Sequence, residues 1–145
     1  MQLLKPYSNY SCFLDAAAMV CDLTQEQLIE KIGHNGSEVL WPELPSPHCF
    51  RGFHLAEILI AMLHFGYAGV FMPCDLYSRS LGPVKHIGHI GYPSTQRGIA
   101  IGENRNGNRH AVAFEGLRIL GGDIEVQEVI FVFKIQPVSG FEVID

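Results

Sequence analysis

Apolar residues recur at helical spacing through the first half of the chain. From Cys12 onwards, Phe, Ala and Val side chains return every three to four positions, which predicts a buried helix that begins at this cysteine. A capping-box pattern at Thr24 and Gln27, with a helix-ending glycine further on, predicts a short second helix over about 25–32. The clearest helical periodicity starts at Leu55 and runs to a glycine stop.

The second half of the chain instead alternates apolar and polar residues, as strands do. A two-residue hairpin turn is predicted at Glu115 and Gly116, which would pair Phe114 with Leu117. Helices first and an antiparallel sheet second predict an α+β fold in which the helices pack on the sheet. Strands are predicted over 67–72, 98–102, 110–114, 117–120 and 124–135.

Two long segments, 34–51 and 74–97, are rich in Pro, Gly and Ser and show no regular period. The first also carries several large apolar residues, so we expect an ordered loop that packs on the body and forms a wall of a site. Within the second, 79–91 is a candidate mobile flap.

Length and charge narrow the classes of protein that remain. The 145 residues suit a single domain over 1–145, and a net charge of −5 argues against nucleic acid as the main partner. The sequence has no signal-peptide pattern and no apolar run long enough to span a bilayer, so we expect a cytoplasmic protein without a membrane partner. The sequence leaves the oligomeric state open.

Four cysteines, at positions 12, 21, 49 and 74, form no closely spaced pair, which predicts free thiols rather than a disulfide framework or a structural zinc site. His86 with His89, or His48 and Cys49 with His54, would be alternative ligand sets, but neither has compact metal-binding spacing. We therefore expect no metal and no cofactor.

Cys12 is the first candidate for chemistry. Ser11 is predicted to cap the helix, and a thiol in its first turn faces the positive end of the helix dipole, which favours the thiolate. Asp15 adds a negative charge to that turn. The alternative interpretation of Cys12 is a small apolar residue that fills a gap in the core.

His110 is the candidate base. It opens the predicted strand 110–114 directly after a polar turn, and no other histidine is so placed. A histidine on a rigid strand that faces the helix start is the arrangement that activates a cysteine nucleophile.

These residues, together with the strand sequence His-Ala-Val-Ala-Phe-Glu-Gly from 110, resemble the papain-like cysteine peptidase superfamily. The chain is most similar to small bacterial and phage members, such as the leader-cleaving peptidase domains of bacteriocin exporters. The segments 33–38, 41–42 and 51–54 also look like proteins of that kind. The resemblance implies a minimal papain-like fold, with Cys12 as nucleophile and His110 as general base acting on a protein or peptide substrate.

Two supporting parts of such a site depart from the family's pattern. The family orients its histidine with an Asn or Asp on the next strand, but the predicted pairing places Gly121 opposite His110. Asp123, a diagonal neighbour, is the candidate orienting residue, and the alternative is a turn aspartate without a catalytic role.

The second departure concerns the oxyanion donor. Pro6 stands where the family has a glutamine six residues before the nucleophile. Asn9 and Gln2 are the candidate donors, with Asn9 favoured because it is closer to Cys12.

The sequence predicts hydrolysis of a peptide or isopeptide bond through a thioester on Cys12. Deamidation of glutamine side chains would use the same two residues. A third hypothesis, motivated by Gly121 and Pro6, is a papain-like fold retained for binding or inhibition, for example in a phage protein that acts on a host component in the host cytoplasm.

Overall fold

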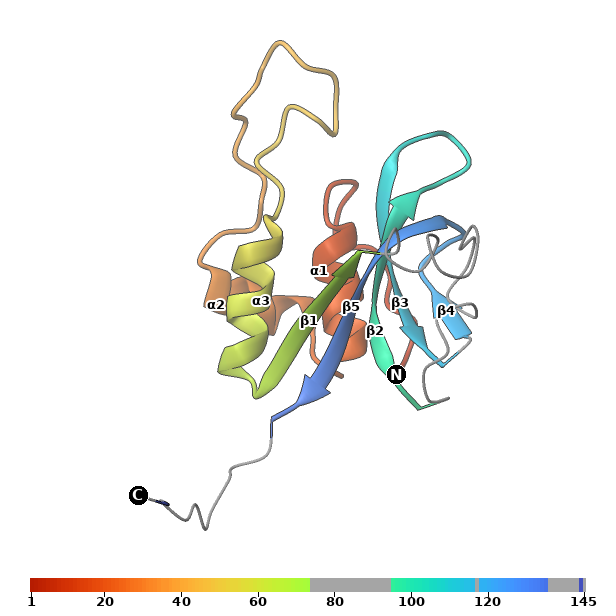
Figure 1. The fold of residues 1–145 in the computed structure, drawn as a ribbon. Coiled ribbons are helices and arrows are strands. Elements are labelled where there is room, and N and C mark those ends of the chain that lie inside the picture. The colour runs from red at the N-terminus through yellow and green to blue at the C-terminus, as the bar shows by residue number, and fades with distance from the viewer. Residues whose placement is uncertain (74–94, 117, 136–143, 145) are drawn as a thin grey trace.

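The computed structural model describes residues 1–73, 95–116, 118–135 and 144, in which three helices cover a five-stranded antiparallel sheet (Figure 1). The sheet order is β1-β5-β2-β3-β4. This arrangement confirms the predicted α+β class. The helices are α1 (Cys12–Val20), α2 (Gln25–Ile32) and α3 (Leu55–His64), and the strands are β1 (Tyr67–Pro73), β2 (Arg97–Glu103), β3 (Arg109–Glu115), β4 (Arg118–Leu120) and β5 (Glu125–Lys134).

The predicted local signals set the element boundaries. Thr24 and Gln27 form the capping box in both directions, and Gly33 ends α2 with a left-handed φ of 90°. The predicted strands agree with the observed ones to within one residue at most ends. The candidate flap, 79–91, and Cys74 lie outside the described residues.

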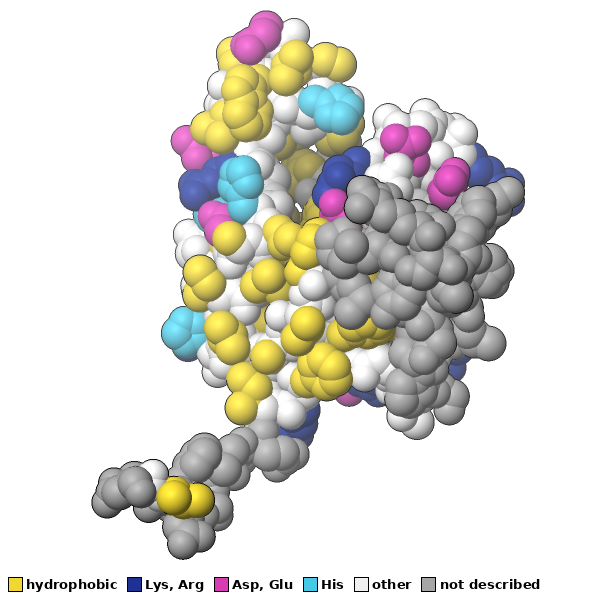
Figure 2. All heavy atoms as spheres, in the orientation of Figure 1, with side chains coloured by type: hydrophobic (Ala, Val, Ile, Leu, Met, Phe, Trp, Pro, Cys, Tyr) yellow, Lys and Arg dark blue, Asp and Glu magenta, His cyan; other side chains and the backbone are white. Residues whose placement is uncertain are grey.

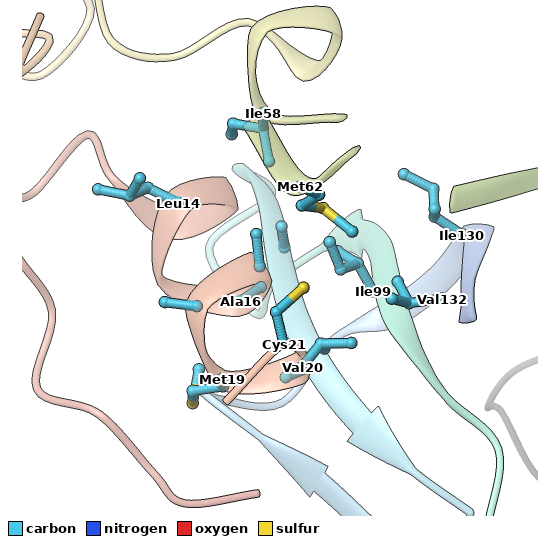
Figure 3. Packing of buried hydrophobic residues seen from close by; sticks show 14 of the residues in the cluster. Leu14, Ala16, Met19, Val20, Cys21, Ile58, Met62, Ile99, Ile130 and Val132 are labelled. Carbon is cyan, nitrogen blue, oxygen red and sulfur yellow. The ribbon is translucent and has the colours of Figure 1, made fainter. Parts of the chain in front are cut away.

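Helix α1 is the centre of the core and packs mainly against β3 (Figure 3). Its residues Ala16, Ala17 and Ala18 are fully buried, and Ala111 and Ala113 of β3 belong to the same cluster. Small side chains on both elements let the two backbones approach closely. In the described part of the chain, no helix is long and apolar enough to cross a membrane.

The predicted turn at Glu115 and Gly116 was wrong by one residue. The structure pairs Glu115 with Arg118 and Phe114 with Ile119, so Glu115 belongs to β3 and the turn begins at Gly116. Two contacts with residues at and just before the start of β2 hold this register. The Glu115 carboxylate forms an ion pair with Arg97, and the Gly116 N–H donates to the Gln96 carbonyl at 2.9 Å.

Residues 36–52 form a hairpin-like projection, here called the arm. Its two sides are joined by backbone hydrogen bonds from Gly52 to Gly36 (3.0 Å) and from Arg51 to Glu38 (2.7 Å). Glu57 of α3 holds the base of the arm by accepting from His34 Nε2 at 2.9 Å. The arm is therefore ordered by its own bonds and by contacts at its base.

Most of the large apolar residues of the arm do not pack on the body, contrary to expectation; Phe50 is the exception, since its ring centroid lies 4.9 Å from that of Tyr10. The arm extends beyond α1 and α3 (Figure 1), and Figure 2 shows hydrophobic side chains at the surface of its outer end. Trp41, for example, is 43% exposed. The other large apolar side chains left exposed on the arm are Val39, Leu40 and Leu44.

Arg97 joins the end of α1 to the sheet. Its guanidinium donates to the Val20 carbonyl at 3.2 Å and to the Asp22 carboxylate at 2.6 Å, and it pairs with Glu115. The hydrogen bond with Arg97 lowers the pKa of Glu115. For Asp22, burial pushes the pKa up, but the bonds with Arg97 outweigh this and leave it lowered.

We expect Arg97→Met to reduce the free energy of unfolding at pH 7 by about 1 kcal/mol, because the network is partly exposed. Carboxylates with lowered folded-state pKa values stabilise the fold above their unfolded values and lose that effect as pH falls through the folded values. The difference between the two proteins should therefore shrink below pH 3.8, the ordinary pKa of Asp22. Urea unfolding at pH 7 and pH 3 measures it.

Arg105→Met is the matched control, since Arg105 pairs with Asp123 through side chains that are 87% and 76% exposed. Its effect should be close to zero at both pH values. An equal effect of the two substitutions would contradict the role given to Arg97.

Candidate active site

Ser11 holds the turn before α1 together, but its side chain does not cap the helix. The Ser11 side chain makes no capping bond; its hydroxyl accepts from the Ser8 N–H at 2.9 Å and lies 2.8 Å from the Asp15 carboxylate. The predicted cap was therefore wrong. Ser11 therefore leaves the first N–H groups of α1, beginning with that of Cys12, without the bond that a capping side chain would make.

His110, near the start of β3, lies against the start of α1. Its Nε2 is 2.8 Å from the Gly121 carbonyl oxygen. Because a carbonyl oxygen only accepts, Nε2 carries a hydrogen and Nδ1 is the nitrogen left to receive a proton. The structure thus brings together the two residues that the sequence singled out, Cys12 and His110.

The surroundings of His110 favour its protonated form. The pKa of the ring is raised, first by a hydrogen bond with the Cys12 side chain and further by the Gly121 carbonyl and the Asp15 carboxylate, while partial burial opposes the shift. The ring is therefore suited to take a proton from a thiol at near-neutral pH.

Cys12 and His110 share a cleft of about 810 Å³. One wall comes from α1 and the segment before it, another from β3 and Gly121, and the third from the arm through Pro47, His48 and Phe50. The expectation that this long loop forms a wall of the site is confirmed at those three residues. The remaining lining residues are Leu4, Pro6, Ser8, Asn9, Tyr10, Phe13, Asp15, Met19, Asn104, Asn108, Arg109 and Ala111.

Asp123 does not lie behind the histidine, so its predicted role as the orienting residue was wrong. Its carboxylate pairs with Arg105 at 3.3 Å, and the side chain is 76% exposed. After β4 the chain passes through Gly121 and Gly122, with φ of 110° and 122°, and this turns the Gly121 carbonyl rather than a side chain towards the ring. A backbone carbonyl was not a candidate that residue types alone could identify.

The two candidate oxyanion donors differ in position. Asn9 lines the cleft, where its side-chain amide donates to Ser46 of the arm at 3.2 Å. Gln2 is exposed and lines a separate hollow beside Leu23 and Thr24, so the structure does not bring it to Cys12. Of the two candidates, only Asn9 lies in the cleft of Cys12, where an oxyanion donor would have to be.

Asp15 is the cleft residue that sequence reasoning undervalued. The sequence assigned it only a favourable charge in the first turn, but the side chain is 6% exposed and lines the same cleft as Cys12. Burial raises its pKa, against the effect of three hydrogen bonds. The signal for its role was an acid three residues after the cysteine in an otherwise apolar helix.

The other described thiols are less suited to chemistry. Burial, with the neighbouring Asp22, raises the pKa of the Cys21 thiol to about 12. Cys49 is half-buried in the arm. Within residues 1–73, 95–116, 118–135 and 144, no three His, Cys, Asp or Glu side chains converge to hold a metal ion, and His86 and His89 fall outside these ranges.

Comparison with known proteins adds no relative: no family model, no curated protein and no solved structure matches this chain. The interpretation of the site therefore depends on its geometry.

Gly122→Ala tests the bond that fixes the histidine. A Cβ at this position would stand 3.3 Å from His110 Nε2, on a backbone with positive φ, so the turn and the ring must shift apart. We expect alkylation of Cys12 by iodoacetamide at pH 6 to slow several-fold. Mass spectrometry of the labelled peptide measures this.

Gly107→Ala is the matched control, because Gly107 also has positive φ (75°) but its Cβ would meet no atom within 4 Å. Both substitutions should cost about 1 kcal/mol in stability through backbone strain. Only the one at Gly122 should change the alkylation rate; an equal change in both would show that strain alone, and not displacement of His110, is responsible.

Proposed function

We propose that this protein is a papain-like cysteine hydrolase that cleaves a peptide or isopeptide bond through a thioester on Cys12. The observation that carries the proposal is the placement of Cys12 and His110 in one cleft, where the Cys12 side chain raises the pKa of His110 and the Gly121 carbonyl fixes the second ring nitrogen. A nucleophile, a base and a group that orients the base are the parts that nucleophilic catalysis requires.

The proposed reaction uses these groups in order. His110 Nδ1 takes the thiol proton, and Cys12 Sγ attacks the substrate carbonyl carbon. The imidazolium then gives its proton to the leaving amine as the carbon–nitrogen bond breaks, which leaves an acyl group on sulfur. A water molecule, deprotonated by the same ring, attacks the thioester, releases the acid and returns the proton to Cys12.

The oxyanion of each tetrahedral intermediate needs hydrogen-bond donors. The N–H groups at the start of α1 receive no capping bond from Ser11, and the Asn9 amide lines the cleft that holds Cys12. In the described structure this amide donates to Ser46 Oγ, so it must leave the arm to serve the oxyanion. Loss of one such donor costs on the order of 3 kcal/mol in the transition state.

The lining of the cleft favours an apolar residue near the scissile bond. Leu4, Phe13, Met19 and Phe50 contribute apolar surface, whereas Asp15 is the one acid among the described lining residues and is itself buried. A bulky apolar side chain of a protein or peptide substrate would therefore release the most water on binding.

A binding or inhibitory module is the second candidate function. It is favoured by two observations: the Asn9 amide is bound to Ser46, and among the described residues the partner of His110 Nε2 is a backbone carbonyl rather than a side-chain acid or amide. Deamidation of a glutamine side chain would use the same proton transfers on a different carbonyl, with ammonia as the leaving group.

Selective alkylation tests the activated thiol. At pH 6, iodoacetamide should label Cys12 well ahead of Cys21, which is buried and has a pKa of about 12, and ahead of the half-buried Cys49. A thiolate formed by proton transfer to His110 is the physical reason. Labelling of Cys12 at or below the rate of Cys49 would contradict an activated pair.

Hydrolysis is tested with a fluorogenic peptide mixture that varies the residues around the scissile bond. We expect Cys12→Ala to reduce cleavage to background and His110→Gln to lower kcat/KM by about 10² or more. Sequences with a large apolar residue beside the cleaved bond should be preferred. If Cys12→Ala leaves the protein's biological effect intact, the binding hypothesis holds instead.

A further inference from the structure

Asp15 is a buried acid that the proposed reaction does not use. It lies three residues after Cys12 on α1, one turn along the same side of the helix. An acid that is 6% exposed is unusual, because burial of a carboxylate is unfavourable unless hydrogen bonds or an opposite charge offset the lost hydration. Both kinds of compensation are present.

Three donors converge on the Asp15 carboxylate. Oδ1 accepts from the Tyr7 N–H and from Gln25 Nε2, each at 3.2 Å, and Oδ2 is 2.8 Å from the Ser11 hydroxyl. The Gln25 amide also donates to the Lys5 carbonyl at 2.7 Å. These bonds join the segment before α1 to α1 itself and to α2, so they fix the turn from which Cys12 emerges.

The charge of Asp15 also acts on His110. The two side chains line one cleft and are coupled in both directions: the carboxylate raises the pKa of His110, and the ring lowers that of Asp15. The other groups around the ring are Cys12 and the Gly121 carbonyl; His48 and Arg109 line the same cleft, and Arg109 is paired with Glu128. Asp15 is thus the one acid in the described lining of the cleft.

We propose that Asp15 is a positioning residue of the Cys12–His110 pair, which holds the turn that carries Cys12 and stabilises the protonated ring of His110 with its buried negative charge. In this site orientation and charge come from separate groups: the Gly121 carbonyl orients the ring, and Asp15 supplies the charge. The proposal rests on the proposed function for its catalytic meaning, but the interaction of Asp15 with His110 is measurable in a protein that hydrolyses nothing.

Asp15→Asn separates the charge from the hydrogen bonds. The new amide oxygen can accept from Tyr7 and Gln25, as Oδ1 does, while the amide nitrogen donates to the Ser11 hydroxyl. That hydroxyl can then turn its hydrogen to the Ser8 carbonyl, 2.9 Å away. The bonds from Tyr7, Gln25 and Ser11 can therefore each be kept, while the negative charge is lost and one further amide N–H is added.

The experiment is an NMR titration of the His110 ring in two proteins, Cys12→Ala and Cys12→Ala with Asp15→Asn, so that the thiol contributes nothing. The signal is assigned by its loss in His110→Gln. We expect the titration midpoint of His110 to fall by roughly half a pH unit or more when the charge is removed. Asp22→Asn, which removes one charge at the far end of α1, should leave the midpoint unchanged.

An unchanged midpoint in a folded Asp15→Asn protein would overturn the proposal. If that variant does not fold, the Asp15 carboxyl carbon is followed by NMR in the Cys12→Ala protein. The coupling between Asp15 and His110 is reciprocal, so the chemical shift of the Asp15 carboxyl carbon must show an inflection at the titration midpoint of His110. If this inflection is absent, the proposal is also overturned. Absence of peptide hydrolysis with a shifted midpoint would instead refute the proposed function alone.

Discussion

The close packing of α1 on β3 is the constraint on which the site depends. Buried alanines meet across this contact, from Ala16 and Ala17 on the helix and from Ala111 and Ala113 on the strand. A larger side chain at any of these positions would push the helix outwards, and Cys12 would move away from His110 with it. Arg97 ties the other end of α1 to the sheet through the Val20 carbonyl, so the helix is held at both ends.

A backbone carbonyl, rather than a side-chain acid or amide, bonds to His110, so the negative charge near the ring has to come from another group. The Gly121 carbonyl fixes which ring nitrogen carries hydrogen, and it does so through a turn that needs two glycines with positive φ. In the proposed reaction, a neutral carbonyl would compensate little of the positive charge that forms on His110 when Cys12 gives up its proton. The buried carboxylate of Asp15 is suited to supply that compensation from the side of the helix.

Two walls of the cleft, the one that carries Cys12 and His110 and the one formed by the arm, are held in place by different interactions. The wall that carries Cys12 and His110 belongs to the hydrophobic core, whereas the arm is held by its own backbone bonds and by Glu57 at its base. Apolar residues of the arm, such as Trp41, stay exposed instead of joining the core. A rigid wall suits the proposed chemistry, which demands fixed distances, and an arm attached mainly at its base suits contact with the proposed substrate.

The sequence by itself determined the features that depend on neighbouring residues. The capping box at Thr24 and Gln27, the glycine that ends α2 and the alternation in the strands fixed the element boundaries, because each acts within a few residues. The residue types and the order of elements were also enough to select Cys12 and His110. The papain-like character of the fold stays a hypothesis.

Only the tertiary structure decided which groups support that pair. The position of the hairpin turn depends on Glu115 meeting Arg97, which lies 18 residues away in the chain. That Gly121 meets His110 with its carbonyl oxygen depends on the path of the chain through the two glycines after β4. Ser11 bonds to Ser8 and Asp15, three and four residues away, instead of capping α1, so here two local interactions compete and the folded turn selects one of them. The bond between Arg97 and Glu115 and the one between His110 and Gly121 join different strands and turns, which no local pattern in the sequence encodes.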